Sequence, residues 1–378
     1  MKTKIRIVAD DKIPFLKGAL EPFAELIYYP GKEINNEMLK DVDALITRTR
    51  TKCNKNLLEG ANVKFIATAT IGFDHIDTRY CAAKGIKWTN APGCNSGSVM
   101  QYIASALIRL SIKHQFILSE KTIGIVGHGN VGSKIARLAL ALGMKVLVND
   151  PPLQRKGELP NSVSIEEIRE KADIITFHVP LNREGIDKTF HLVDEFFLKS
   201  VKPGCIIINS SRGEVVDELA LKNALKDKTL KGAVLDVWEN EPHIDLELLG
   251  LLDLATPHIA GYSADGKANG TAMSVQAISD FFGFGLQNWF PSSVPMPQNP
   301  EITIETDGKA DQEIFTKLIL TTFDIMGDDG RLRNSVETFE KQRGDYPMRR
   351  EFMSYHVNLM TENRILKEKL MKIGFKIK

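Results

Sequence analysis

Three polar side chains of complementary chemistry occur in the middle of the chain. Arg212 follows an apolar run, Glu241 lies in the loop after the next run, and His258 lies in the following turn. A guanidinium can bind a carboxylate through two parallel hydrogen bonds, and a histidine can take a hydroxyl proton near neutral pH. A carboxylate beside the imidazole would fix its tautomer. Together these groups suit the oxidation of a hydroxy acid, although each residue taken alone is also compatible with a surface or structural role.

A glycine-rich turn with the spacing G-x-G-x-x-G lies between a strand pattern at Thr122–Val126 and a helix pattern. In such a turn Gly127 would allow the tight bend, Gly129 would let the backbone approach a pyrophosphate, and Gly132 would let helix and strand pack closely. Asp150 lies eighteen residues beyond Gly132, at the end of the next strand, where a carboxylate can bind a ribose diol and repels a 2′-phosphate. Two prolines, and no arginine, follow it. The sequence therefore predicts NAD and not NADP; the alternative is a purely structural strand–turn–helix.

The segments between these residues must position them, and from residue 4 to residue 260 short β-branched runs alternate with helical periodicity. That alternation is typical of parallel sheets covered by helices, so we predict an α/β protein. Open sheets of this kind bind ligands at the carboxyl ends of their strands. The expected strands are 4–9, 44–48, 63–68, 122–126, 145–149, 174–177, 205–209 and 233–237. The expected helices are 14–27, 74–84, 98–119, 131–142, 164–171, 217–226 and 263–286. The helix at 98–119 would begin with a capping box at Ser98.

The last part of the chain differs in composition. A proline-rich stretch at 291–297 predicts a linker, and a further unit begins near residue 300. Residues 341–378 contain ten Lys or Arg and four Asp or Glu, a net charge of +6, and we expect most of it on a final helix that begins near Met348. A solvated helical face would explain this charge; a subunit interface or an anion contact is the alternative.

Composition excludes several classes of protein. With 378 residues, 43% hydrophobic and 26% charged, the chain resembles ordinary globular proteins with more than one core. The net charge of +1 gives no reason to expect nucleic acid or a membrane surface as a partner. No long apolar run predicts a signal or a membrane span, and four widely spaced cysteines suggest reduced thiols and no metal site. We therefore expect a cytoplasmic protein.

Five motifs of the chain resemble motifs of the D-isomer-specific 2-hydroxyacid dehydrogenases and occur in the same order as in that family, over about residues 40–290. The resemblance implies that Arg212 binds the substrate carboxylate and C2 oxygen, that His258 is the acid/base and that Glu241 is its partner. For NAD it implies contacts from Gly127, Gly129, Asn130, Val131, Gly132, Asp150, Val179, Asp236 and Gly261. The motifs are Gly127–Gly132, His178–Leu181, Asn209–Gly213, Asp236–Pro242 and Thr256–Gly261.

The resemblance also implies a fold of two flavodoxin-like or Rossmann doubly wound parallel-sheet domains plus a smaller C-terminal α+β dimerisation domain. Residues 1–97 and 260–290 would form a discontinuous substrate-binding domain, and residues 98–259 would form the NAD-binding domain. Residues 291–378 would be the dimerisation domain. The residue pattern alone predicts the boundary near 98, but it does not predict that the chain returns to the first domain.

A basic, hydroxyl-rich segment at the end of an early strand resembles one branch of the family, which acts on a small phosphorylated 2-hydroxy acid. Arg48, Thr49 and Arg50 belong to this segment, whose charges suit a phosphate. The resemblance adds Thr70 and Tyr262 as substrate contacts. A solvated strand end is the alternative for the basic cluster.

The C-terminal part resembles the same branch, in which a domain of this size pairs two subunits, so we expect a homodimer. The segment Arg343–Phe352 is similar to an arginine-containing segment of that branch. The local basic excess suggests that Arg349 or Arg350 reaches the partner subunit's active site and neutralises the substrate phosphate.

Two other functions stay open at this point. One is a relative that acts on 3-phosphoglycerate, glyoxylate or lactate, although residues 300–378 lack the βαββαβ pattern of a regulatory tail. The other is an NAD-sensing binding protein without enzymatic activity, because the family includes transcriptional corepressors. An assay of NAD reduction distinguishes an enzyme from such a binding protein.

Overall fold

The computed structural model describes residues 4–361 and 363–378 of the chain. It divides into two compact units, one made of Met1–Asn95 and Ser263–Pro295, the other of Ser96–Tyr262 and Met296–Lys378. Both units are built on parallel sheets, and the predicted α/β class is confirmed. Within the described residues, no helix combines the length and apolar character needed to cross a membrane. The four cysteines are free and buried, as predicted.

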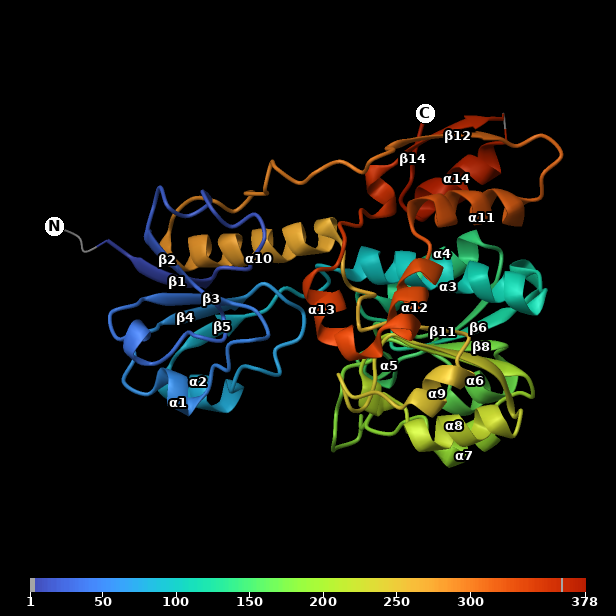
Figure 1. The fold of residues 1–378 in the computed structure, drawn as a ribbon, viewed down its shortest axis with the longest axis horizontal. Helices are drawn as coiled ribbons and strands as arrows, with labels where there is room; N and C mark the ends of the chain where they lie inside the picture. Colours follow the sequence, from blue (N-terminus) through green and yellow to red (C-terminus); the bar gives the residue numbers. More distant parts are fainter. Residues whose placement is uncertain (1–3, 362) are drawn as a thin grey trace. The chain divides into compact units, whose positions relative to one another are not determined.

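The first unit contains a five-stranded parallel sheet with the order β2-β1-β3-β4-β5, which is the flavodoxin-like winding. Helix α10 packs on one face of this sheet and helices α1 and α2 pack on the other (Figure 1). Strands β3 and β4 are buried throughout, as expected for central strands covered on both faces. The elements are β1 Arg6–Asp10, β2 Glu25–Tyr29, β3 Ala44–Thr47, α1 Lys55–Leu58, β4 Phe65–Thr68, α2 Thr78–Lys84, β5 Lys87–Thr89 and α10 Ala264–Phe282.

The second unit contains a six-stranded parallel sheet with the order β11-β10-β9-β8-β6-β7. Strand β6 pairs with both β7 and β8, so the winding changes direction there and leaves a crevice at the carboxyl end of β6. Helices α3 and α4 pack on one face, and α6 to α9 on the other. The elements are α3 Ser96–His114, β6 Thr122–Val126, α4 Gly132–Ala141, β7 Lys145–Asn149, α5 Pro151–Arg155, α6 Ile165–Lys171, β8 Ile174–Phe177, α7 Glu195–Lys199, β9 Cys205–Asn209, α8 Glu218–Lys226, β10 Leu230–Leu235, α9 Leu246–Leu251 and β11 Leu254–Ala255.

The C-terminal part of the chain shares the hydrophobic cores of this second unit. Its own parallel sheet has the order β12-β13-β14, and α11 packs against α3 while α14 packs against α4 (Figure 1). Helix α12 contacts the edge strand β11, where the backbone N–H of Ala255 donates to the carboxylate of Asp329 at 2.7 Å. The elements are β12 Glu301–Glu305, α11 Asp311–Thr322, α12 Met326–Asn334, α13 Phe339–Gly344, β13 His356–Met360, α14 Arg364–Lys372 and β14 Lys376–Ile377.

Several predicted elements are wrong. The segment 14–27 forms turns that lead into β2, because Pro14 and Pro22 oppose a helix and the strand gains parallel partners in β1. Helix α3 starts at Ser96, so Ser98 lies inside it, and its hydroxyl donates to the carbonyl of Ala260 at 2.8 Å. The final helix does not begin near Met348, since β13 precedes α14. Strands β5 and β11 were not predicted.

Candidate active site

The predicted site residues of the second unit all lie at one edge of its sheet. Six of them come within three residues of the carboxyl end of a strand, the others lie in the segments that follow these strands, and the strands are parallel neighbours. This edge is where ligands bind in open α/β sheets. The six residues are Gly127 after β6, Asp150 after β7, Val179 after β8, Arg212 after β9, Asp236 after β10 and His258 after β11.

The glycine-rich turn has the geometry of a phosphate cradle. Gly127 has φ +91°, and a side-chain carbon at this position would come within 2.5 Å of the His178 carbonyl oxygen. A carbon on Gly132 would come within 1.9 Å of the Gly127 carbonyl oxygen, so only glycine fits there. Gly129 and Asn130 are exposed, and a carbon on Gly129 would meet no described atom within 4 Å. Helix α4 has no side-chain cap among the described residues, which leaves its positive end to a phosphate.

Asp150 is oriented by two backbone donors. Its carboxylate accepts from the N–H of His128 at 2.7 Å and from the N–H of Leu153 at 3.0 Å, so it caps α5 and ties this helix to the glycine turn. Each oxygen keeps capacity for another donor, and the side chain is only partly buried. These residues fit a dinucleotide whose pyrophosphate lies on α4 and whose ribose lies beside Asp150.

His258 and Glu241 form the acid–base pair that the residue types predict. The Nδ1 atom of His258 lies 2.8 Å from Oε2 and 3.1 Å from Oε1 of Glu241. Glu241 is 19% exposed and also accepts from the backbone N–H of Trp238 at 3.0 Å. His258 is 33% exposed. With Nδ1 engaged by the carboxylate, Nε2 is the atom left to exchange a proton with a ligand.

Asp236 holds the backbone that presents His258. Its carboxylate is buried and accepts from the N–H groups of Ile259 at 2.7 Å and Ala260 at 2.9 Å, and from the hydroxyl of Thr256 at 2.6 Å. Burial raises the pKa of Asp236, and its four neighbours act against that rise. His258 has φ +56°, an uncommon value outside glycine, and its N–H donates to the Asp236 carbonyl at 2.7 Å. Asp236, which the resemblance assigns to the cofactor, thus also anchors the turn.

Arg212 lies beside the Glu241 loop. Asn209 stabilises its turn by donating to the Arg212 carbonyl at 2.8 Å. A side-chain carbon on the next residue, Gly213, would meet the Trp238 carbonyl at 2.0 Å, so the two loops touch through glycine. Because Trp238 also donates to Glu241, one packed contact joins the arginine turn to the acid–base pair.

Two further histidines near this edge differ from His258. Burial lowers the pKa of His178 to about 3, so its imidazole is neutral at physiological pH, and it is paired with the Thr176 hydroxyl at 2.9 Å. His191 lies 2.5 Å from the carboxylate of Glu239 and stacks on Phe190. His191 therefore provides a natural comparison for His258, because it has the same type of partner but follows no strand of the sheet.

In the first unit, the predicted substrate residues also gather at one carboxyl edge. Strands β3 and β4 pair in parallel, so the segments that follow them lie side by side. Thr49 and Arg50 are exposed there, whereas Arg48 forms a two-pronged ion pair with the buried Asp10 at 3.2 and 3.3 Å. The Thr70 hydroxyl donates to the Gly72 carbonyl at 2.9 Å. Much of the charge of Arg48 is therefore balanced within the protein.

Three C-terminal residues that pack on the catalytic turn were not assigned there from the sequence. Arg343 lies with Nη1 3.9 Å from Oε2 of Glu241, and the Tyr346 ring meets the Tyr262 ring edge-on at 5.7 Å. Arg349 is buried, contacts the Ser98 hydroxyl and donates to the Ala260 carbonyl at 2.7 Å. The hypothesis that Arg349 reaches a partner subunit is therefore wrong, because its guanidinium is enclosed in its own chain.

Arg350 was the other candidate for a contact with the partner subunit. Its side chain is also buried, and its carbonyl accepts from the side chain of Gln101 at 3.0 Å. Both arginines therefore belong to the interior of the second unit, and the expected excess of basic residues on a C-terminal helical face does not include them.

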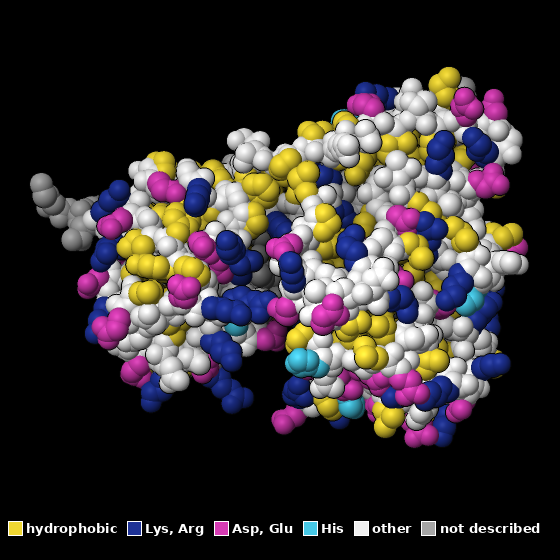
Figure 2. Space-filling model, in the orientation of Figure 1, with side chains coloured by type: hydrophobic (Ala, Val, Ile, Leu, Met, Phe, Trp, Pro, Cys, Tyr) yellow, Lys and Arg dark blue, Asp and Glu magenta, His cyan; other side chains and the backbone are white. Residues whose placement is uncertain are grey.

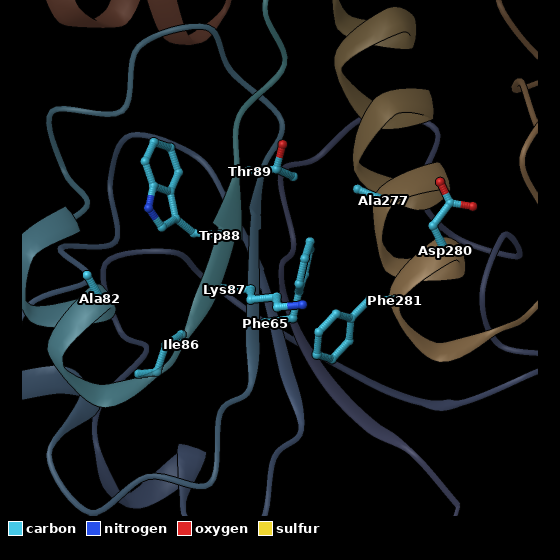
Figure 3. A pocket seen from close by; sticks show the side chains of 9 residues that line it. All are labelled: Phe65, Ala82, Ile86, Lys87, Trp88, Thr89, Ala277, Asp280 and Phe281. Carbon is cyan, nitrogen blue, oxygen red and sulfur yellow. The ribbon is translucent and has the colours of Figure 1, made fainter.

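The first unit also contains a large hollow that none of these residues line. It has a volume of about 660 Å³ and lies between the edge strand β5 and helix α10. Figure 3 shows Lys87 reaching across it toward Phe281, with the ammonium 5.7 Å from the ring centroid. The hollow lies on the face of the sheet and not at its carboxyl edge, so we do not include it in the candidate active site.

Comparisons with known proteins agree with this geometry. Residues 109–260 match the family described as D-isomer specific 2-hydroxyacid dehydrogenase, NAD binding domain. The erythronate-4-phosphate dehydrogenase of Bacteroides fragilis is 50% identical over 354 residues, which are 93% of this chain and 99% of that protein. The enzyme of the same name from Shigella flexneri is 39% identical over 374 residues, 98% of each chain. The chain belongs to the erythronate-4-phosphate dehydrogenase family.

Solved structures match a large part of this chain but not all of it. The D-lactate dehydrogenase of Aquifex aeolicus, crystallised with NAD and lactic acid, is 27% identical with a TM-score of 0.62, and it matches over 100% of its length but only 77% of this chain. Residues 294–374 match a domain of unknown function, DUF3410. This chain thus combines an NAD-dependent D-2-hydroxyacid dehydrogenase core with this further segment, and the predicted cofactor NAD is confirmed.

Proposed function

We propose that this chain oxidises 4-phospho-D-erythronate with NAD to 2-oxo-3-hydroxy-4-phosphobutanoate, a reaction that would serve the biosynthesis of pyridoxal 5′-phosphate (vitamin B6). The observation that carries the proposal is the His258–Glu241 pair at 2.8 Å, beside the Arg212 turn at the edge of a dinucleotide-binding sheet. The names of the relatives at 39% to 50% identity support the choice of substrate.

The residues support a two-part oxidation. Nε2 of His258 takes the proton of the C2 hydroxyl, while Glu241 holds the Nδ1 proton and stabilises the imidazolium that forms. The guanidinium of Arg212 binds the substrate carboxylate and the C2 oxygen, and so fixes the alcohol next to the imidazole. NAD, when bound, accepts the hydride from C2. The C2–H and O–H bonds break, a C2=O double bond forms, and the imidazolium later releases its proton to water.

We assign the cofactor contacts to the carboxyl edge of the second unit. Gly127, Gly129 and Gly132 shape the cradle for the pyrophosphate, with Asn130 and Val131 in the same turn. Asp150 selects the ribose hydroxyls. On the nicotinamide side we retain Val179, Asp236 and Gly261, of which Asp236 has the additional task of anchoring the His258 turn.

We assign the phosphate of the substrate to the basic segment at residues 48–50, and we retain Thr70 and Tyr262 as contacts of the substrate. Arg50 is exposed and its charge suits a phosphate, and part of the charge of Arg48 is balanced by Asp10. This makes residues 1–97 and 260–290 the substrate-binding domain and 98–259 the NAD-binding domain. The boundaries between the compact units, after Asn95 and Tyr262, support this division.

We further propose a homodimer formed through residues 291–378. Large hydrophobic side chains reach the surface of this part. Figure 2 shows where hydrophobic side chains of all types come to the surface on one face of the molecule. A second copy that covers such side chains would remove apolar area from water, which favours association. Sedimentation should give twice the mass of 42.2 kDa, and a monomer would contradict the dimer. The exposed side chains are Met296, Met326, Met348, Met353, Met360, Ile365 and Met371.

We also place the protein in the cytoplasm, supported by its four free, buried thiols. Cell fractionation with antibody detection tests this location. Recovery of the protein with a soluble cytoplasmic marker would agree with it, and recovery with a membrane or exported marker would contradict it.

A substrate panel tests the proposed reaction. Purified protein is mixed with NAD or NADP and with 4-phospho-D-erythronate, 3-phosphoglycerate, D-glycerate or D-lactate, and reduced nicotinamide is followed by its absorbance. We expect the highest kcat/KM for 4-phospho-D-erythronate with NAD. Preference for another acid would assign the chain to that reaction. NAD binding without any reduction would favour a binding protein.

A further inference from the structure

A short C-terminal segment borders the catalytic turn of its own chain. Arg343, on helix α13, forms an ion pair with Glu340 at 2.9 Å and lies 3.9 Å from Glu241. It also hydrogen-bonds to Tyr262, whose ring contacts Tyr346. One guanidinium thus connects the carboxylate that orients the catalytic histidine with the tyrosine assigned to the substrate.

The environment of Arg343 differs from that of an ordinary surface arginine. Its side chain is only 20% exposed, and its Nε atom is buried with no hydrogen-bond partner among the described atoms. A buried unpaired donor is costly and requires an explanation, which a pair with Glu340 on a six-residue helix does not supply. Arg364 provides the contrast: it pairs with Glu368 at 3.0 Å and is 89% exposed.

We propose that Arg343 is a positioning residue for the dehydrogenase reaction, because its guanidinium holds Glu241 and Tyr262 in the arrangement that His258 and the substrate require. The inference rests on the proposed function and extends it, since it makes the C-terminal segment part of the active-site support. Arg343 itself touches none of the reacting atoms in this account.

The charge of Arg343 acts on the His258–Glu241 pair in two ways. A cation near Glu241 favours the carboxylate form, and the same cation disfavours a second positive charge on His258. The first effect keeps Glu241 as an acceptor for the Nδ1 proton of His258, and the second opposes protonation of the imidazole before the substrate binds. The charged and titratable groups around the pair and the guanidinium are Asp236 beside His258, Glu218 and Glu239 beside the Glu241 loop, Glu340 on α13, and Tyr262. Behind Tyr262 lies Tyr346, which contacts Asp328 on α12 and Arg349.

Three variants of the full-length protein test the proposal. R343Q removes the charge, whereas R343K keeps the charge but lacks the planar guanidinium with its several donors. R364Q removes another Arg–Glu ion pair within a helix, at an exposed site. For each we would measure NAD affinity, and kcat and KM for 4-phospho-D-erythronate from pH 5 to pH 10. Unchanged NAD affinity shows that the cofactor site is intact.

We expect R343Q to lose about tenfold in kcat/KM at pH 7. The acid limb of its pH profile, where kcat/KM rises with pH, should move up by about half a pH unit. R343K should keep the acid limb in place while kcat falls several-fold, and R364Q should match the wild type. Wild-type kcat/KM and pH profile in R343Q, or the same shift in R364Q, would overturn the proposal. If R343Q does not fold, R343K decides, and wild-type kcat in R343K would overturn the proposal.

Failure of the proposed function is a separate result. If the wild type oxidises none of the panel acids, that function is wrong, and the positioning role is then tested without substrate. An NMR titration of the His258 ring resonances in wild type and R343Q should show different midpoints. Equal midpoints would overturn the inference.

Discussion

The five-stranded and six-stranded sheets both place their predicted site residues at the carboxyl edge, but the two edges are built differently. At the six-stranded edge the buried Asp236 carboxylate holds the His258 turn through three donors, and Gly127 and His258 adopt positive φ. At the five-stranded edge Thr49 and Arg50 are exposed, and Arg48 is bound by Asp10.

The difference shows how one type of fold supports two tasks. Proton and hydride transfer need groups held within a few tenths of an ångström, and buried hydrogen bonds supply that order. Recognition of a phosphate needs mainly charge and donors, which exposed side chains can supply. We therefore expect substitutions at the edge of the six-stranded sheet to lower kcat for every substrate. Substitutions at the edge of the five-stranded sheet should raise KM for phosphorylated substrates alone.

The largest effect is expected from H258A. Loss of the base should lower kcat/KM by about 10²- to 10⁴-fold with every substrate while NAD binding stays close to normal. The matched control is H191A, which removes a histidine with a carboxylate partner that lies outside the pair. Near-normal turnover in H258A, or an equal loss in H191A, would show that the edge of the six-stranded sheet is not the centre of proton transfer.

At the other edge, R50Q should raise KM for 4-phospho-D-erythronate by about tenfold, because a charge-assisted hydrogen bond to phosphate is lost. Its kcat/KM for D-glycerate should stay within twofold of the wild type. Arg79 on α2 is exposed in the same unit but away from the edge, so R79Q controls for charge alone. Equal losses with phosphorylated and unphosphorylated acids would remove the distinction between the two edges.

A smaller effect is expected from D150N. Asparagine can still cap α5, so the folded state should be preserved, but the loss of the carboxylate should weaken NAD about fivefold and narrow the preference over NADP. D194N makes the same change at the cap of α7 and should leave both cofactor affinities unaltered. Fluorescence titration with both cofactors checks the ratio; an unchanged ratio would contradict the ribose assignment.

The smallest effect on turnover is expected from Glu218, which supports the Glu241 loop by accepting the Glu239 N–H at 2.9 Å. Burial, aided by Glu239, Asp245 and Glu241, raises the pKa of Glu218 from 4.5 to about 7. Below the unfolded value of 4.5 the group is protonated in both states, so it does not change stability. Between pH 4.5 and about 7 the unfolded state ionises while the folded state stays protonated, so the folded state loses stability until the pH has risen through about 7.

E218Q should therefore unfold like the wild type near pH 4, whereas at pH 8 it should be more stable by at most about 3 kcal/mol. Urea denaturation at the two pH values measures this difference. A stability gap that does not grow with pH would mean that Glu218 is not held in a destabilising environment.

The parts of the molecule that could be predicted from sequence are those with local signals. Gly127–Gly132 and Asp150 lie within one strand–turn–helix–strand segment, so their spacing reports their geometry. Strands β6 to β9 were predicted within their observed bounds because β-branched runs and turns alternate there.

The errors occur where distant segments decide the structure. Residues 25–29 form a strand because Arg6–Asp10 pairs with them, and no local periodicity shows that pairing. The contact between Arg343 and Glu241 joins residues about a hundred positions apart, and the burial of Arg349 depends on Ser98 and Ala260. A run of basic residues looks the same in sequence whether it is solvated or enclosed, so these roles required the fold.

The central claim is that His258 accepts the hydroxyl proton, and the pH dependence of kcat/KM for 4-phospho-D-erythronate tests it most directly. In the wild type kcat/KM should rise along an acid limb as one group loses its proton. In H258A the residual rate should lack that limb, although NAD still binds. An acid limb at the same pH in both proteins would contradict the account, because another group would then be the base.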